Sequence, residues 1–317
     1  MSSLIEKISE VAPYIGETPL YRLDVENIEL YGKLEYFNLT GSVKDRAAYN
    51  ILTSAIRGGE IDDRTTIIES SSGNFALSLA TICRHLGLKF IAVIDPNINA
   101  LNEKKIRDLA YKVVKVTERD ETGGFLLSRI RYIEEVMRTE QNVYWTNQYD
   151  NPDNFGGYYK TLGPEIIRAL PVLDYVFVAV SSGGTVTGLS RSLKEHYKGL
   201  KVVAVDVEGS VIFRATPKRR HISGIGSSKA SSILQHAIID DVCIVTEPDI
   251  VKGANSLYAE HNIFAGGSSG AIWFAIQEYF RHRDFFRQPV VAFVCPDYGE
   301  SYRNTIYNTN WVAAELT

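Results

Sequence analysis

The chain has 317 residues, of which 45% are hydrophobic, and its formal net charge at pH 7 is −4. This length is sufficient for the buried cores of two domains, and a net negative charge argues against general attraction to nucleic acid or to anionic membranes. No apolar run is long enough to cross a bilayer, and the first residues lack the pattern of a signal peptide. We therefore expect a cytoplasmic protein.

The cysteines indicate a reducing compartment. Cys83, Cys243 and Cys295 each lie in an apolar stretch and form no CxxC pair, so we expect three buried free thiols. None of the six histidines has the spacing of metal ligands. The sequence therefore predicts neither disulfide exchange nor a metal site.

Short β-branched runs alternate with stretches of helical periodicity along the chain. Strands are expected at residues 65–68, 90–94, 113–116, 176–180, 202–205, 242–245 and 290–294, and helices at 75–85, 125–137, 186–196 and 272–280. This alternation predicts an α/β fold with parallel sheets and helices on both faces. We expect each glycine-rich loop to follow a strand and to open a helix, where open α/β sheets bind ligands.

The first polar motif spans residues 38–46 and contains Lys44. Ser42 resembles an N-cap, and the apolar residues Ala47 and Ile51 follow at helical spacing, so Lys44 is expected in the first turn of a helix. The positive end of the helix dipole disfavours the charged form of its amine there, as a Schiff-base lysine requires. Taken alone, the motif favours a solvated surface lysine.

The second motif is Ser71-Ser72-Gly73-Asn74, between an expected strand and an expected helix. Successive backbone N–H groups at a helix N-terminus, together with serine hydroxyls, suit a carboxylate ligand. The alternative is an ordinary serine-rich turn that caps the helix.

The third motif consists of Ser181, Ser182, Gly183, Gly184 and Thr185. A tight glycine loop between a strand and a helix lets the backbone approach a phosphate, and the threonine adds a hydroxyl. Asp206 ends the next expected strand, where a dinucleotide-binding acid would lie, so a nicotinamide-dependent oxidoreductase is a minor alternative. The glycines do not form the GxGxxG pattern of that class.

The fourth motif, Gly-Gly-Ser-Ser-Gly at residues 266–270, contains Ser268. In their order and intervals, the four motifs resemble the fold-type II pyridoxal-phosphate (PLP) enzymes of the cysteine synthase and cystathionine β-synthase family, which are tryptophan synthase β-like. The resemblance covers nearly the whole chain. Within the family, the chain is most similar to the siderophore-pathway branch. That branch joins O-phospho-L-serine to L-glutamate, giving N-(2-amino-2-carboxyethyl)-L-glutamate for 2,3-diaminopropionate biosynthesis.

The resemblance implies PLP-dependent β-replacement through an α-aminoacrylate, with Lys44 as both the Schiff-base residue and the general base. It assigns the cofactor to Lys44, Asn74, Ser181, Ser182, Gly183, Gly184, Thr185 and Ser268, and the substrate carboxylate to Ser71, Ser72, Asn74 and Gln148. A neutral hydroxyl such as that of Ser268 at the ring nitrogen favours β-elimination over transamination.

The resemblance also implies the architecture and the assembly. Two open, twisted, mostly parallel sheets flanked by helices are expected, in a smaller domain of residues 41–147 and a larger domain of residues 1–40 plus 148–317. PLP is expected in the cleft between the two domains. The expected partners are small amino-acid substrates and a second copy of the chain in a homodimer.

Three departures from the cysteine synthase pattern bear on the substrate: Arg129, Tyr149 and Ser182. An arginine with two hydroxyls nearby suits a phosphoryl leaving group, which would bind through charge-assisted hydrogen bonds. The alternative is that Arg129 is a solvated helix cation and Tyr149 a packing aromatic, in a cysteine synthase that uses O-acetylserine or O-phosphoserine. The basic run at residues 217–221 is expected to be a solvated loop. Tyr298, where the family usually has serine, is expected to make a supporting contact.

Overall fold

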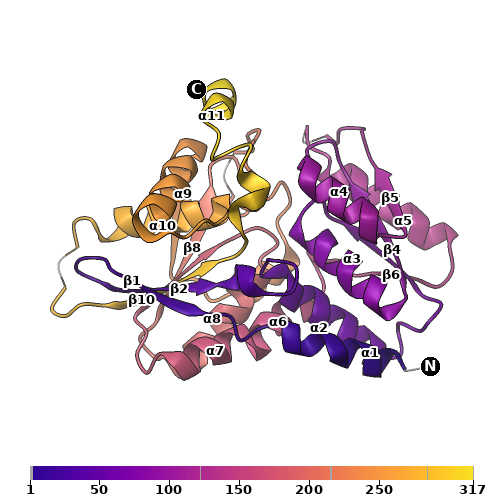
Figure 1. Cartoon of the computed structure of the whole chain (residues 1–317), viewed down its shortest axis with the longest axis horizontal. Coiled ribbons are helices and arrows are strands. Elements are labelled where there is room, and N and C mark those ends of the chain that lie inside the picture. The colour runs from indigo at the N-terminus through magenta and orange to yellow at the C-terminus, as the bar shows by residue number, and fades with distance from the viewer. Residues whose placement is uncertain (1–2, 122, 215, 284, 317) are drawn as a thin grey trace.

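The computed structural model describes residues 3–121, 123–214, 216–283 and 285–316, which contain two open sheets with helices on their faces (Figure 1). In spatial order, the larger sheet contains β1 (Leu20–Leu23), β2 (Glu29–Leu34), β10 (Val290–Cys295), β7 (Tyr175–Ala179), β8 (Lys201–Val207) and β9 (Asp241–Val245). The smaller sheet contains β5 (Lys112–Lys115), β4 (Lys89–Ile94), β3 (Thr66–Ser70) and β6 (Val143–Trp145). Every described strand pair is parallel except β1 with β2, so the predicted fold class is confirmed.

All strands expected from β-branched runs are present, but β1, β2 and β6 were not predicted. The sequence of β2, Glu-Leu-Tyr-Gly-Lys-Leu, mixes charges and a glycine with apolar residues. β6 has only three residues, all half-buried. These strands form because neighbouring strands offer hydrogen bonds to them, and their own composition carries little strand signal.

Helices cover both sheets (Figure 1). They are α1 (Leu4–Val11), α2 (Lys44–Arg57), α3 (Asn74–Leu86), α4 (Ala100–Leu109), α5 (Leu126–Thr139), α6 (Asp153–Lys160), α7 (Leu162–Ala169), α8 (Gly184–His196), α9 (Glu247–His261), α10 (Gly267–Phe280) and α11 (Thr309–Glu315), with 3-10 turns η1 (Ala12–Tyr14), η2 (Glu35–Phe37), η3 (Ser232–His236) and η4 (Gly299–Tyr302). The helices expected from periodicity correspond to α3, α5, α8 and α10.

The larger sheet is apolar on both faces, as a parallel sheet covered by helices must be. Along β7, Val176 and Val178 join a cluster that contains residues of α2, α3 and α8 and also of the smaller sheet. Phe177, on the opposite face, joins a second cluster with residues of α9 and α10. One continuous core therefore connects the two sheets.

The N-terminal residues divide between the two sheets. β2 pairs with β10 and so belongs to the larger sheet, whereas α1 contacts α2 and α3. The Lys7 amine donates a hydrogen bond to the carbonyl oxygen of Leu86 at 3.1 Å, which holds α1 against the end of α3. The predicted domain boundary between residues 147 and 148 stays a prediction.

The thiols do not share one environment. Cys83 and Cys295 are buried, but Cys243 is half-buried, so the expectation of a buried thiol is wrong for Cys243. It lies in β9, the last strand at one edge of the larger sheet. A search of the described helices for one long and apolar enough to span a bilayer found none.

A buried ion network connects α2 with β2 and α7. The Arg46 guanidinium donates two hydrogen bonds to the Glu35 carboxylate, at 2.6 and 2.8 Å, and two to the Glu165 carboxylate, at 2.6 and 2.8 Å. Lys33 forms a further ion pair with Glu165 at 2.6 Å. One arginine thus pairs with two buried carboxylates.

We expect Arg46→Met to lower the free energy of unfolding by about 3–5 kcal/mol, because Glu35 would stay buried without the cation it pairs with and Glu165 would keep only Lys33. Urea denaturation followed by circular dichroism measures this loss. The matched control is Arg64→Met, which breaks an exposed pair with Asp62 and should cost less than about 1 kcal/mol. Equal losses in the two variants would contradict the importance of the buried network.

Candidate active site

Lys44 is the half-buried first residue of α2, as the sequence predicts. The N-cap prediction for Ser42 is wrong: the N-cap position is Val43, because Ser42 forms a β-bridge with Asp297. The Ser42 hydroxyl still accepts a hydrogen bond from the Lys44 N–H at 3.3 Å. Burial lowers the pKa of the Lys44 amine to about 8, and the negative charge of Asp297 opposes this shift.

The segment after β10 connects the Lys44 loop with the start of α10. The Val43 N–H donates to the carbonyl oxygen of Pro296 at 2.7 Å, and the Gly266 N–H donates to that of Asp297 at 3.0 Å. Ser268, in the first turn of α10, is 1% exposed. The prediction that a strand precedes this glycine loop is wrong, because the loop follows α9 and an isolated bridge between Ala265 and Tyr298.

The Ser71–Asn74 loop faces the same segment. Asn74 opens α3, and its Nδ2 donates to Asp297 Oδ2 at 2.7 Å. The Ser71 hydroxyl accepts a hydrogen bond from the Ala76 N–H at 3.3 Å, within the first turn of the helix. Gln148 Nε2 donates to the carbonyl oxygen of Ser70 at 3.2 Å. The structure thus brings the predicted carboxylate clamp together beside the Lys44 loop.

The loop of residues 181–185 joins β7 to α8. Gly183 has φ +87°, and a Cβ on Gly184 would lie 2.1 Å from Asn154 Oδ1, so both positions require glycine. The Ser182 hydroxyl is buried and, among the described residues, has no hydrogen-bond partner. Thr185 lies in the first turn of α8. A glycine turn, a helix N-terminus and an unpaired hydroxyl together suit an anion.

Arg129 is not a solvated helix cation, so the alternative expected for this residue is wrong. It lies on α5 with only 8% of its surface exposed; Nη1 donates to the Ser72 hydroxyl at 3.0 Å, and Nε lies 3.3 Å from Asp95 Oδ2. Burial raises the pKa of the Tyr149 hydroxyl, and the positive charge of Arg129 opposes this shift, so the two side chains interact. Arg129 therefore lies beside the Ser71–Asn74 loop, and its charge acts on the Tyr149 hydroxyl.

Ser182, the third departure from the cysteine synthase pattern, lies in a different loop from Arg129 and Tyr149. Ser227 lies close enough to the Tyr149 hydroxyl to oppose the rise in its pKa that burial causes, and the Ser181 hydroxyl donates to the carbonyl oxygen of Gly226 at 3.0 Å. Residues 226 and 227 thus connect Tyr149 with the 181–185 loop.

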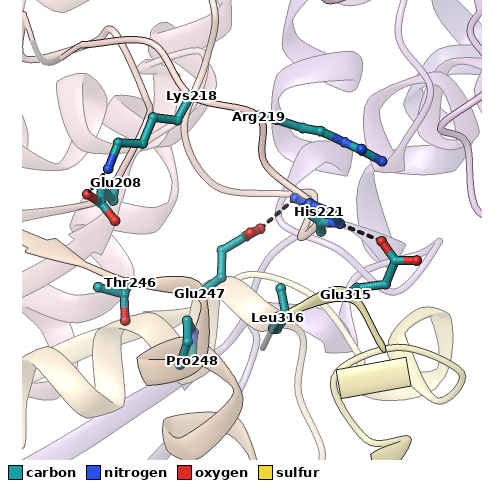
Figure 2. A pocket seen from close by; sticks show the side chains of 9 residues that line it. All are labelled: Glu208, Lys218, Arg219, His221, Thr246, Glu247, Pro248, Glu315 and Leu316. Carbon is teal, nitrogen blue, oxygen red and sulfur yellow. Dashed lines mark hydrogen bonds and ion pairs between the residues drawn. The ribbon is translucent and has the colours of Figure 1, made fainter. Parts of the chain in front are cut away.

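The basic run of residues 217–221 is solvated only in its first part. Lys218 and Arg219 are exposed, whereas Arg220 and His221 are half-buried, so the expectation of a solvated loop is wrong for those two residues. Figure 2 shows His221 against Glu315 of α11, with Nδ1 2.8 Å from the carboxylate. They line a cavity of about 300 Å³ whose lining includes no residue that the sequence assigns to cofactor or substrate.

A smaller cavity of about 100 Å³ reaches the site itself. Its lining includes Thr40, Gly41, Asn74, Asp297 and Tyr298. Sequence reasoning did not assign a role to Asp297, nor to Asp95, the partner of Arg129. Each aspartate follows the end of a predicted strand, at residues 290–294 and 90–94. A position just after the carboxyl end of a parallel strand is the sequence signal that could have identified both aspartates as site residues.

Comparison with known proteins identifies the class. The family described as "Pyridoxal-phosphate dependent enzyme" matches residues 11–297. The chain belongs to this family. The N-(2-amino-2-carboxyethyl)-L-glutamate synthase of Ralstonia nicotianae is 41% identical over 304 residues, which cover 94% of this chain and 89% of that protein. The resemblance to this branch is therefore confirmed, and PLP is the cofactor, as predicted.

Solved structures of PLP enzymes have the same fold. The O-acetylserine-dependent cystathionine β-synthase of Helicobacter pylori is 27% identical with a TM-score of 0.84, covering 96% of this chain and 98% of that chain. O-ureido-L-serine synthase is 27% identical with a TM-score of 0.85, covering 99% of each chain. The nicotinamide alternative is wrong: Asp206 is 1% exposed, and its carboxylate accepts a hydrogen bond from the Val207 N–H at 2.8 Å.

The site of this PLP-dependent enzyme fits its cofactor. The Lys44 amine has a pKa suited to a covalent link with an aldehyde. The unpaired Ser182 hydroxyl and the left-handed Gly183 at the start of α8 suit the phosphate. The hydroxyl of Ser268, in the first turn of α10, suits the ring nitrogen. These assignments of individual residues are proposals that the family fold supports.

We expect the rate at which cofactor-free protein incorporates PLP to rise with pH and to level off near pH 8. Only the neutral amine attacks the aldehyde, so each pH unit below the lowered pKa should reduce the rate about tenfold. Stopped-flow absorbance of the forming complex measures this profile. A rate that kept rising toward pH 10.5, the ordinary lysine pKa, would contradict a buried, low-pKa Lys44.

Proposed function

We propose that this enzyme joins O-phospho-L-serine to L-glutamate by β-replacement and releases inorganic phosphate. The Cβ–O bond breaks, and its electron pair leaves with the phosphate. A Cβ–N bond to the glutamate amine forms, and that amine loses one proton. The product is N-(2-amino-2-carboxyethyl)-L-glutamate, which the 41% identical relative is named for making.

The position of Arg129 is the observation that carries this proposal. Ser72 and Asp95 hold its guanidinium in place, and hydrogen bonds from Nη2 to described residues are absent, so those N–H groups remain for a ligand. A doubly charged phosphoryl group suits such donors through charge-assisted hydrogen bonds, whereas an acetyl group does not. Tyr149 supplies a hydroxyl whose raised pKa keeps it a proton donor at neutral pH.

The predicted residues bind the substrate, hold the cofactor or move a proton in this reaction. Ser71, Ser72, Asn74 and Gln148 are proposed to bind the substrate carboxylate, and Lys44 links to the cofactor. PLP, when bound, supplies the electron sink that makes the Cα proton acidic. The Lys44 amine then takes the Cα proton and later returns it, because a pKa of about 8 lets it serve as both base and acid near neutral pH.

Product analysis tests the proposal directly. The purified enzyme is incubated with O-phospho-L-serine and, separately, with L-glutamate, L-aspartate, L-glutamine and sulfide, and products are identified by mass spectrometry. We expect N-(2-amino-2-carboxyethyl)-L-glutamate and one equivalent of phosphate with glutamate. Cysteine from sulfide, with no glutamate adduct, would reject the proposal in favour of a cysteine synthase. Replacing O-phosphoserine by O-acetylserine in parallel identifies the leaving group.

We further propose the cellular and oligomeric setting. Free thiols at Cys83, Cys243 and Cys295 support a cytoplasmic location. A homodimer is supported by an aromatic cluster in which Phe37 is 61% and Tyr298 48% exposed. The ring of Tyr298 lies 5.4 Å from that of Phe264, so the supporting contact expected for Tyr298 is made to another aromatic side chain. Light scattering on the purified holoenzyme measures the oligomeric state, and a monomer mass would reject the dimer.

The sheets support the proposed domains. The four-stranded sheet lies wholly within residues 41–147, and the six-stranded sheet takes its strands from residues 1–40 and 148–317. The proposal does not require the smaller domain to fold on its own, because one hydrophobic core extends between the two sheets.

A further inference from the structure

Asp297 lies in the segment that follows β10, and its carboxyl group has no role in the reaction proposed above. Asp297 is 4% exposed, and its backbone bridges to Ser42, next to the Lys44 loop. Its carbonyl oxygen accepts the Gly266 N–H ahead of Ser268. A Cβ on Gly266 would lie 2.0 Å from Asp297 Oδ1, so the carboxyl group lies directly against that backbone. Asp297 is thus placed where the lysine loop meets the ring-nitrogen loop.

One oxygen of the carboxyl group accepts two hydrogen bonds. Asn74 Nδ2 donates to Oδ2 at 2.7 Å, and the Tyr302 hydroxyl donates to the same oxygen at 2.8 Å. A Cβ on Gly224 would lie 2.8 Å from the Tyr302 hydroxyl oxygen, so the loop of residues 222–228 packs against this hydroxyl. Asp297 Oδ1 is buried and, within the described residues, has no partner. Such an acceptor is costly unless something else engages it.

The charge of Asp297 acts on Lys44. Burial lowers the pKa of the Lys44 amine, and the negative charge of Asp297 opposes this shift. Burial raises the pKa of Asp297, and the hydrogen bonds from Tyr302 and Asn74 and the positive charge of Lys44 oppose that shift. The other titratable groups that face Asp297 are Tyr302, Tyr307 and Cys295, and burial raises the pKa of each, so they are neutral near pH 7. Lys44 is therefore the cation that faces this carboxyl group in the described part of the chain.

We propose that Asp297 is a positioning residue, which fixes the orientation of the Asn74 amide and keeps a negative charge beside Lys44. An asparagine amide can rotate to exchange its oxygen and its NH₂ group. With a carboxylate at 2.7 Å, the rotated amide would set two acceptors against each other, so the NH₂ group stays toward Asp297. The other N–H of the Asn74 NH₂ group is then held in a fixed direction. This inference rests on the proposed role of Lys44.

A double-mutant cycle on cofactor affinity tests the action through Asn74. PLP dissociation constants are measured by fluorescence for the wild type, Asp297→Ala, Asn74→Ala and the double variant. We expect Asp297→Ala to weaken PLP binding about tenfold in the wild type but less than about twofold in the Asn74→Ala background. Equal weakening in both backgrounds would overturn the proposal. Glu300→Gln, which removes an exposed carboxylate from the same segment, is the matched control and should bind PLP normally.

A second measurement on cofactor-free protein tests the charge. The extent of acylation of Lys44 by acetic anhydride is followed against pH by peptide mass spectrometry, which needs neither substrate nor turnover. We expect Asp297→Asn to lower the midpoint by about one pH unit, because the amine loses a stabilising negative charge. Glu300→Gln should leave it unchanged. Tyr302→Phe, a milder variant for use should Asp297→Asn misfold, removes one stabilising donor from the carboxylate and should shift the midpoint downward by less.

An unshifted midpoint in both Asp297→Asn and Tyr302→Phe would overturn this part of the proposal. Failure of the proposed glutamate-transferring reaction would leave both measurements intact, because neither one involves O-phosphoserine or glutamate. The proposal for Asp297 and the proposed glutamate-transferring reaction can therefore be rejected independently of each other.

Discussion

Replacing Lys44 by Ala is expected to reduce turnover about 10³-fold or more, because the chain loses both its cofactor link and the base for the Cα proton. Product formation from O-phospho-L-serine and L-glutamate measures the loss. Borohydride reduction of the wild-type holoenzyme, followed by peptide mapping, should place the reduced cofactor on the peptide that contains Lys44. The Lys44→Ala protein should show no such adduct.

The matched control is Lys198→Ala, which removes an exposed lysine after α8. It should retain wild-type turnover and the cofactor adduct at Lys44. Full activity of Lys44→Ala, or an adduct on any other lysine, would remove the chemical basis for the roles proposed for all surrounding loops.

The second large effect is expected at Arg129. Arg129→Met should lower kcat/KM for O-phospho-L-serine about ten- to hundredfold, because charge-assisted hydrogen bonds to the phosphoryl group are lost. The value for O-acetylserine, whose leaving group carries no charge, should change less than about threefold. Steady-state kinetics with both substrates therefore yields a ratio that reports on the leaving group alone.

Two controls separate this effect from damage to the fold. Arg131→Met, two residues further along α5, breaks an exposed ion pair with Glu121 at 2.9 Å and should affect neither substrate. The double variant Arg129→Met/Asp95→Asn removes the unpaired carboxylate that Arg129→Met leaves behind. If both substrates lost the same factor in both Arg129 variants, Arg129 would be a structural residue of the site and not its phosphoryl anchor.

Much of the site could be predicted from the order of motifs along the chain. The helix that begins at Lys44 and the glycine turn before α8 are local features, since dihedral preferences and neighbouring residues decide them. The strands β7, β8 and β10 were recognisable because parallel strands buried on both faces are continuous apolar runs. Strands β1 and β2 lack such runs, and the pairing of β2 with β10 and of β1 with β2 decides their structure.

The partners of Arg129 were beyond sequence reasoning for a specific reason. β3 and β4 pair in parallel with Ser70 opposite Val93, so two residues further on Ser72 and Asp95 meet, and the Ser72 hydroxyl donates to Asp95 Oδ2 at 2.9 Å. A shift of this register by one residue would separate them. Neither the order of strands in a sheet nor their register is encoded in a local pattern.

By itself, then, the amino-acid sequence determined the α/β class, the lysine at a helix start and the loops suited to anions, because these depend on short-range periodicity and backbone preference. The tertiary structure alone decided that Asn74 meets Asp297 across 223 residues of chain. It also decided that Arg129 is buried beside Ser72. The contact of Asn74 with Asp297 joins loops of the two sheets, so it depends on the packing of these sheets on a common core, whereas Arg129 reaches Ser72 because α5 packs on the smaller sheet.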